Sequence, residues 1–221
     1  MVEIQKYTEN MVLRLRERFG PRLLYVGLQG SYLRGEATEH SDIDVMAVLD
    51  ELKVSDLDAY RQVKDAMEEP EKACGFICGK EDLAHWNPME ICHLLHTTKD
   101  CFGCLVRLVP DYSDVDVRNF VKMSVNNLYH ELCHRYIYGS WQKNTAHLPG
   151  TYKGVFFILQ NLYYLETGSF VPTKKELLSR LSGKNRRVLE RAMAFSGEGE
   201  YDFDESYELL FTWCQETMYT L

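Results

Sequence analysis

The 221-residue sequence predicts an α+β protein: a mixed sheet flanked by helices in the N-terminal part, then a C-terminal helical bundle. Residues 22–28 and 43–50 are short apolar runs of strand length, each bounded by polar or turn residues. From about Ser113 onward, apolar residues instead recur at helical spacing. We therefore expect a boundary near Pro110 and two domains, residues 1–110 and 111–221.

The N-terminal part begins with a predicted helix that ends at Gly20-Pro21. Its apolar face is formed by residues at helical spacing: Ile4, Tyr7, Met11, Leu15 and Phe19. Ser55 and Asp58 predict a capping box for a second helix that continues to about Glu69. Besides the strands at 22–28 and 43–50, two more are expected at residues 75–78 and 91–97.

The C-terminal part is expected to contain only helices, with glycines near several of the breaks between them. The predicted helices are residues 114–138, 151–166, 174–182, 185–195 and 204–219, and the glycines are Gly168, Gly183 and Gly197.

Composition narrows the functional classes. The net charge of −8 and pI near 5.4 argue against a protein whose main task is to hold nucleic acid. No apolar run approaches the roughly 18 residues that span a bilayer, and the N-terminus lacks a signal-peptide pattern. We therefore expect a cytoplasmic protein with no membrane partner. The seven cysteines, an odd number, are expected to be free and mostly buried thiols.

Two carboxylates open the second apolar strand. Because side chains alternate along a strand, Asp42 and Asp44 lie on one face, where like charges repel. A divalent cation relieves this repulsion, and hard oxygen ligands favour Mg²⁺ over Zn²⁺. Upstream, Gly30 and Ser31 follow the first strand in a turn whose backbone N–H groups are available to a phosphate.

Gly30-Ser31, Gly35 and Ser41-Asp42-Ile43-Asp44 resemble the signature of the DNA polymerase β-like nucleotidyltransferase superfamily. The resemblance implies that Asp42 and Asp44 hold Mg²⁺ against a nucleoside triphosphate, while an acceptor oxygen attacks the α-phosphorus and pyrophosphate leaves. It also implies that Gly30, Ser31 and Ser41 cradle the phosphates, with Arg34 placed to reach them.

The superfamily usually needs a third carboxylate, for which Glu90 is the first choice. In aminoglycoside adenylyltransferases of the streptomycin/spectinomycin type, a Glu at a comparable place starts a strand and acts as general base. Glu90 precedes the predicted strand at 91–97, so the same role is expected for it. Asp100, near the other end of that strand, is the alternative, and a solvated strand-end role for Glu90 also stays open.

The stretch "LQNLYYLETGSFVPTKKELL" (159–178) resembles a segment of the same adenylyltransferases, in which a Lys at a helix start contacts the ATP phosphates. The resemblance implies this role for Lys174, with Thr173 and Glu176 forming a capping box. A simply exposed Lys174 is the alternative. The family's triphosphate-binding Arg corresponds here to Gln160, and Lys153 is a possible substitute donor.

"HELCH" (130–134) satisfies the H-E-x-x-H pattern of zinc peptidases, but three fixed letters are a weak filter and no third ligand is evident. Glu131 and His134 are instead candidates for a polar wall of an acceptor pocket, where Glu131 orients a cationic substrate. A surface or structural role is the other interpretation. Cys101-x-x-Cys104 is a single pair without a second, so a zinc ribbon is not predicted.

Two functions follow. The first is a Mg²⁺-dependent enzyme that transfers AMP from ATP to a hydroxyl of a small molecule, with aminoglycoside-like antibiotics as the acceptors that the resemblance and the acidic charge suggest. The alternative is a minimal-nucleotidyltransferase module that nucleotidylates or neutralises a protein partner, as in toxin–antitoxin pairs.

Overall fold

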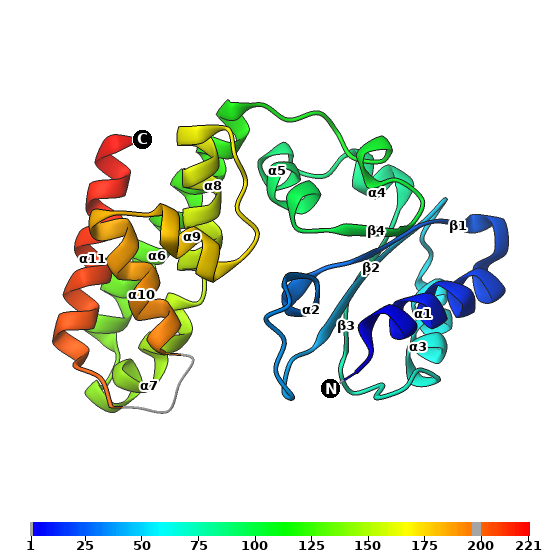
Figure 1. The fold of residues 1–221 in the computed structure, drawn as a ribbon, viewed down its shortest axis with the longest axis horizontal. Coiled ribbons are helices and arrows are strands. Elements are labelled where there is room, and N and C mark those ends of the chain that lie inside the picture. The colour runs from blue at the N-terminus through cyan, green and yellow to red at the C-terminus, as the bar shows by residue number, and fades with distance from the viewer. Residues whose placement is uncertain (1, 196–199) are drawn as a thin grey trace. The chain divides into compact units, whose positions relative to one another are not determined.

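The computed structural model describes residues 2–195 and 200–221. The chain divides into two compact units, Met1–Tyr112 and Ser113–Leu221 (Figure 1). The first unit combines a sheet with helices and the second is helical, so the α+β prediction is confirmed. The expected break at Gly197 lies outside the described residues.

A four-stranded sheet organises the first unit. Its strands are β1 (Leu23–Leu28), β2 (Ile43–Leu49), β3 (Ala73–Gly79) and β4 (Lys99–Phe102), in the order β3-β2-β1-β4. β1 is antiparallel to both β2 and β4, whereas β3 is parallel to β2. The three strands expected at 22–28, 43–50 and 75–78 are thus confirmed within a few residues, and the sheet is mixed.

Helices cover both faces of this sheet. On one face, α1 (Ile4–Phe19) and α3 (Val54–Asp65) bury an apolar cluster that includes Met11, Leu15 and Val45 (Figure 1). On the other face, α4 (Lys80–Ala84), α5 (Pro88–His96) and a short 3-10 helix (Leu105–Arg107) pack residues such as Leu83 against Met46 and Val48. Burial on both sides explains why β2 reads as one continuous apolar run.

The strand predicted at residues 91–97 is wrong, because this segment belongs to α5. Asn87 caps the helix by accepting a hydrogen bond from the Met89 N–H at 3.1 Å, and Pro88 occupies its first position, where the missing N–H costs nothing. The apolar residues fall at helical spacing: Ile91, Cys92, Leu94 and Leu95. The fourth strand is β4, which begins only at Lys99.

The start of α3 also differs from prediction. The carboxylate that caps it is that of Asp56, which accepts a hydrogen bond from the Lys53 N–H at 2.9 Å, so the box expected from Ser55 and Asp58 is wrong. Arg22, directly before β1, donates two hydrogen bonds to the same carboxylate at 2.8 and 2.9 Å and a third to Asp50 at 3.1 Å. Through these three hydrogen bonds, the Arg22 guanidinium connects the start of β1 to the end of β2 and to α3.

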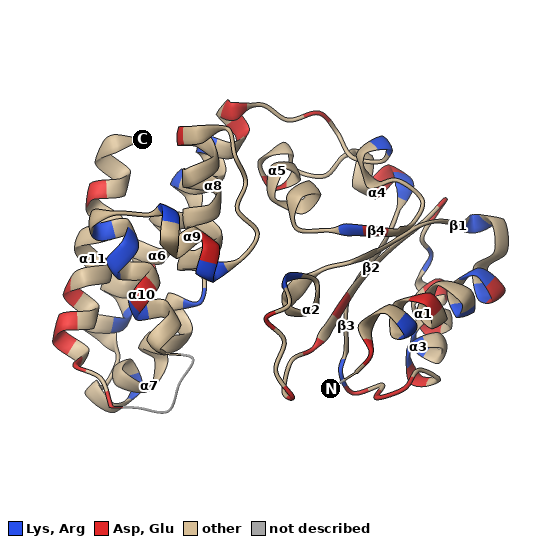
Figure 2. Cartoon of the chain, viewed as in Figure 1, with Lys and Arg blue, Asp and Glu red and all other residues tan. Residues whose placement is uncertain are grey.

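The second unit is a bundle of six helices in the residues that the structure describes: α6 (Asp114–Tyr138), α7 (Trp141–Tyr152), α8 (Val155–Thr167), α9 (Lys174–Arg180), α10 (Gly183–Ala194) and α11 (Phe203–Thr220). Its core contains the fully buried side chains of Trp213, Tyr152 and Phe156. Five of these helices were predicted, whereas α7, which contains Pro149, was not. α11 carries four acidic residues and no Lys or Arg (Figure 2).

The charges at Asp56 predict a pH-dependent contribution to stability. The hydrogen bonds from Arg22, followed by that from the Lys53 N–H, lower the pKa of Asp56 to about 2. Asp56→Ala should therefore lower the free energy of unfolding at pH 7 by about 2 kcal/mol. Because the folded-state pKa is depressed, the deficit should be complete above pH 4 and disappear as the pH falls towards 2.

Urea unfolding of both proteins at several pH values measures this difference. Asp58→Ala is the matched control, because Asp58 pairs with Arg61 on the surface, where both side chains are about two-thirds exposed (67% and 69%). Its effect should stay within about 0.5 kcal/mol. Equal effects of the two substitutions would contradict the structural role of Asp56.

Candidate active site

The turn after β1 approaches the second Asp of the D-x-D motif closely. The Gln29 N–H donates to the carbonyl oxygen of Asp44 at 2.9 Å, and Gly30 then begins the short helix α2 (Gly30–Arg34). Gly30 has a φ of +72°, and a Cβ atom there would stand 1.9 Å from Oδ2 of Asp44. The position therefore requires glycine twice over, for backbone conformation and for space.

The electrostatics of the site favour a cation. Asp44 is half-buried as the second residue of β2, and Asp42 is exposed just before the strand. Burial, and then repulsion from Asp42, raise the pKa of Asp44, while Cys74 and Arg34 act in the opposite direction. Such a carboxylate pair gains stability when a positive charge neutralises it.

The other residues of the predicted signature lie in the connection between β1 and β2. The carbonyl oxygen of Ser31 accepts a hydrogen bond from the Glu36 N–H at 2.9 Å. The hydroxyl of Ser41 accepts one from the Thr38 N–H at 2.8 Å, and therefore closes the loop before Asp42. Arg34 forms an ion pair with Glu36 at 2.9 Å. These contacts order the loop that leads to the Asp pair.

Glu90 is placed differently from the expectation. It lies exposed in the first turn of α5, not at a strand start, and accepts a hydrogen bond from Nε1 of Trp86 at 2.6 Å. His93, one turn further along α5, is close enough to Arg34 that burial, together with this positive charge, lowers the His93 pKa to about 4. Glu90 and His93, three residues apart, lie on the same side of α5.

Asp100, the alternative to Glu90, lies on β4 opposite Gly27. Its Oδ1 accepts a hydrogen bond from the buried hydroxyl of Tyr25 at 2.7 Å. Burial and this hydrogen bond raise the Tyr25 pKa. Asp100 thus has a structural partner on β1.

The neighbours of Asp44 across the sheet could not be read from the sequence. Gln29 lies beside Asp44 on one side, and its side-chain Nε2 donates to Oγ1 of Thr98 at 2.8 Å. On the other side, Cys74 of β3 is the register partner of Asp44. We call Cys74, Asp44, Gln29 and Thr98 the Asp44 row. Asp44 has no carboxylate neighbour within this row.

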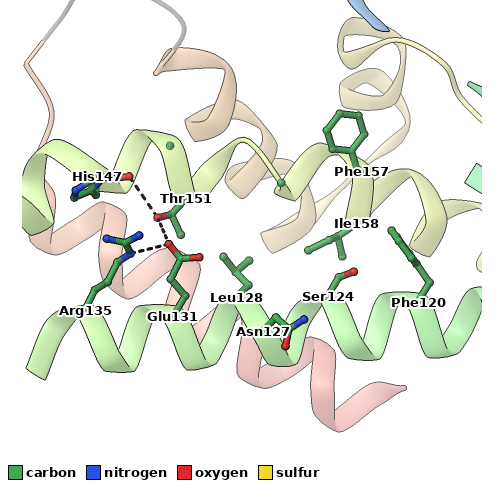
Figure 3. Close-up of a pocket in the computed structure, with 12 residues that line it drawn as sticks. Phe120, Ser124, Asn127, Leu128, Glu131, Arg135, His147, Thr151, Phe157 and Ile158 are labelled. Carbon is green, nitrogen blue, oxygen red and sulfur yellow. Dashed lines mark hydrogen bonds and ion pairs between the residues drawn. The ribbon is translucent and has the colours of Figure 1, made fainter. Parts of the chain in front are cut away.

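The second unit contains a pocket of about 530 Å³ between α6, α7 and α8 (Figure 3). Glu131 lies in its wall, where its Oε1 accepts hydrogen bonds from Nε of Arg135 at 2.7 Å and from the Thr151 hydroxyl at 3.4 Å. Aromatic and aliphatic side chains form the rest of the lining together with small polar residues, among them Phe120, Phe157, Ile158, Ser124 and Asn127. Glu131 is therefore a pocket residue.

His134 is not among the residues that line this pocket. Its ring lies 4.9 Å from that of Tyr138 and 6.0 Å from that of His130, on another part of the α6 surface. Within residues 2–195 and 200–221, no group of three His, Cys, Asp or Glu side chains is gathered as a metal site. The H-E-x-x-H pattern thus shows no assembled zinc site in this part of the chain.

The segment before Lys174 is organised by Gln160. This residue is fully buried in α8, and its Nε2 donates to the carbonyl oxygens of Val171 at 2.7 Å and Pro172 at 3.3 Å. Thr173 caps α9 as expected, by accepting a hydrogen bond from the Glu176 N–H at 3.3 Å. Lys174 follows, with its ammonium 5.8 Å from the centre of the Phe156 ring. Gln160 therefore has a structural role where the resemblance implies an Arg.

A mixed sheet with a Gly-Ser turn packed against the second Asp of a D-x-D strand is the arrangement expected of a nucleotidyltransferase domain. In agreement, residues 9–83 match the family model described as a nucleotidyltransferase domain. The match covers the later part of α1, the first three strands and most of α4, and so includes the complete Gly-Ser and D-x-D signature.

Two known proteins are similar to the chain. Protein adenylyltransferase MntA of Thermococcus cleftensis is 48% identical over 50 residues, which are 21% of this chain and 48% of MntA. The chain thus spans about half the length of this curated relative. Spectinomycin adenyltransferase AAD(9) of Enterococcus faecialis, solved with ATP and spectinomycin, is 15% identical with a TM-score of 0.60. That similarity covers 97% of this chain and 99% of AAD(9), and it concerns the fold.

No helix among the described residues combines the length and the apolar character needed to cross a membrane.

The contact between Gly30 and Asp44 predicts a specific coupling. Gly30→Ala and Gly35→Ala both place a side chain at positive φ (+72° and +68°), which costs about 1–2 kcal/mol. Only the first also drives a methyl group into the Asp44 carboxylate, since nothing lies within 4 Å of a Cβ atom at Gly35. We expect Gly30→Ala to destabilise the chain by about 1–3 kcal/mol more than Gly35→Ala.

Urea unfolding in a double-mutant cycle checks this prediction. In an Asp44→Ala background the carboxylate is absent, so the two glycine substitutions should cost nearly the same. A difference that persists in this background would contradict the close contact.

Proposed function

We propose that the chain is a Mg²⁺-dependent nucleotidyltransferase that transfers AMP from ATP to a hydroxyl group. The observation that carries the proposal is the half-buried Asp44, held against Gly30 and repelled by Asp42. This arrangement is unfavourable for the isolated protein and favourable once a cation and a polyphosphate are bound.

The residues present fit a hard divalent cation. Asp42 and Asp44 supply carboxylate oxygens, the ligands that Mg²⁺ prefers, and Mg²⁺ usually completes its shell with water and substrate phosphates. When bound, Mg²⁺ stabilises negative charge on the reacting phosphate and orients it for in-line attack. A two-carboxylate site suits a cation that arrives with the nucleotide.

The chain's own groups then bind and orient the triphosphate. The glycine conformation at Gly30 leaves the backbone of the turn open to a phosphate, with Ser31 next to it. Arg34 is on the same short helix, and we propose that it contacts a phosphate oxygen in addition to Glu36. Ser41 holds the loop that presents Asp42. Lys174 of the second unit is proposed as a further phosphate contact.

We propose Glu90 as the general base that takes the proton of the attacking hydroxyl. Support comes from α5, where the exposed Glu90 carboxylate lies one turn before His93, a residue on which the charge of Arg34 acts. A general base needs a carboxylate oxygen that the attacking hydroxyl can reach, and the exposed Glu90 offers one.

The acceptor proposed is a small polyhydroxylated and cationic molecule that binds in the pocket of the second unit. A volume of about 530 Å³ is within the range of small-molecule sites, and its mixed lining provides both packing and hydrogen bonds. Glu131 supplies the negative charge for a cationic group. The fold shared with AAD(9), a spectinomycin adenyltransferase, supports an aminoglycoside-like acceptor, which would make the chain an antibiotic-resistance enzyme.

A protein acceptor is the second candidate. It is favoured by the 48% identity over 50 residues with MntA, a protein adenylyltransferase. Incubation with Mg²⁺ and ATP labelled at the α-phosphate separates the two candidates. A labelled small molecule from an antibiotic panel supports the first, and a labelled protein band from a lysate supports the second.

The Asp pair provides the decisive variants. Asp42→Asn or Asp44→Asn should lower label transfer at least about 10²-fold, because each removes a ligand charge from the cation site. The apo variants should be at least as stable as wild type, since repulsion between the carboxylates is relieved. Asp58→Asn, on the surface of α3, is the control and should transfer label normally. Unchanged transfer by either site variant would refute the proposed function.

The proposed base gives a separate prediction. Glu90→Gln should lower kcat by about 10²–10⁴-fold with little change in ATP affinity, while the amide oxygen can still accept the hydrogen bond from Trp86. Steady-state kinetics and calorimetric ATP titration measure the two effects. Glu81→Gln, a change at an exposed residue of α4, is the matched control. A normal kcat for Glu90→Gln would remove Glu90 from the mechanism.

A further inference from the structure

Two residues that line the pocket of the second unit, Gly150 and Gly154, have no side chain. Gly150 lies inside α7, and Gly154 precedes α8 with a φ of −71° and a ψ of −22°, so neither has the left-handed conformation that favours glycine. A Cβ atom at either position would meet nothing within 4 Å. Neither the backbone conformation nor the packing of the fold therefore requires glycine at these two positions.

The space that the missing side chains leave belongs to the pocket. Residues three or four apart lie on one side of a helix. Gly150 thus faces the same way as His147, and Gly154 faces the same way as Phe157 and Ile158. All three of these neighbours line the pocket (Figure 3). A side chain at either glycine would therefore extend into the volume of about 530 Å³ that a ligand would fill.

Glu131 provides a hydrogen-bond acceptor on the opposite wall of the pocket. Its Oε1 is held by Nε of Arg135 and by the Thr151 hydroxyl. Its Oε2 accepts no hydrogen bond from the residues that the structure describes, so it is available to a donor group of a ligand. Asn127 and Ser124 lie one and two turns before Glu131 on the same side of α6 and also line the pocket. Polar groups thus follow α6, whereas the glycines leave room on the side of α7 and α8.

We propose that Gly150 and Gly154 are specificity-determining residues, because their lack of side chains leaves room for a ring-sized part of the acceptor beside Glu131. The inference rests on the proposed function, which assigns this pocket to the acceptor. Glycine inside a helix is less favourable than alanine, so the chain loses helix stability at Gly150 and gains pocket width. Phe157 and Ile158 supply the apolar surface on which the carbon face of such a ring packs.

Calorimetric titration of the full chain with spectinomycin and with streptomycin, without ATP or Mg²⁺, tests the proposal. Gly150→Ala should weaken binding about threefold and Gly150→Leu at least about tenfold, because the added atoms occupy the space of the ligand. The urea unfolding midpoint of Gly150→Ala should equal or exceed that of the wild type, since alanine is the better helix former. Gln142→Ala and Gln142→Leu are the matched controls, because Gln142 is an exposed residue of the same helix and does not line the pocket. Both should bind as the wild type does.

Three results would overturn the inference. The first is wild-type affinity in Gly150→Leu, which would place the ligand elsewhere. The second is a lower unfolding midpoint of Gly150→Ala, which would show that the fold itself requires this glycine. The third is a wild-type chain that binds neither compound. The proposed function fails on a different measurement, unchanged label transfer by the variants of the Asp pair, so the two failures are distinguishable.

Discussion

The approach of the Gly30 backbone to the Asp44 carboxylate is the constraint on which the candidate active site depends. Antiparallel pairing of β1 with β2 brings the end of one strand beside the beginning of the other, and the hydrogen bond from the Gln29 N–H to the Asp44 carbonyl fixes their register. Only a residue without a side chain fits between them. The fold thereby keeps Asp42 and Asp44 close enough to repel each other. The burial of Ile43 and Val45 in the core offsets the cost of this repulsion.

The rest of the first unit holds this contact in place. At the far end of the two strands, Arg22 links Asp50 and Asp56 and so joins the sheet to α3. On the opposite face, α5 packs Leu94 and Leu95 against the sheet and carries His93 and Glu90. The loop from Gly35 to Ser41 is closed by hydrogen bonds between Thr38 and Ser41, directly before Asp42.

The second unit contains the pocket to which we assign the acceptor. Its pocket combines aromatic walls with the Glu131–Arg135 pair, in which the carboxylate also accepts a hydrogen bond from Thr151. Gln160 fixes the segment that leads to Thr173 and Lys174 through two buried hydrogen bonds. Where the resemblance implies a phosphate-binding Arg, this chain therefore has a residue that shapes the backbone, so phosphate recognition would depend more on the first unit.

The sequence alone determined the features that depend on neighbouring residues: the apolar period of α1, strands β1 and β2, the glycine turn, the D-x-D pair and the cap at Thr173. Local spacing is sufficient for these, because each follows from backbone geometry over a few residues. It failed at Glu90, which lies in a helix and not at the start of a strand. Only the tertiary structure decided that Cys74 and Gln29 flank Asp44, that Asp100 pairs with Tyr25 and that Gln160 is buried, since strand order, register and long-range packing bring together residues that no local pattern connects.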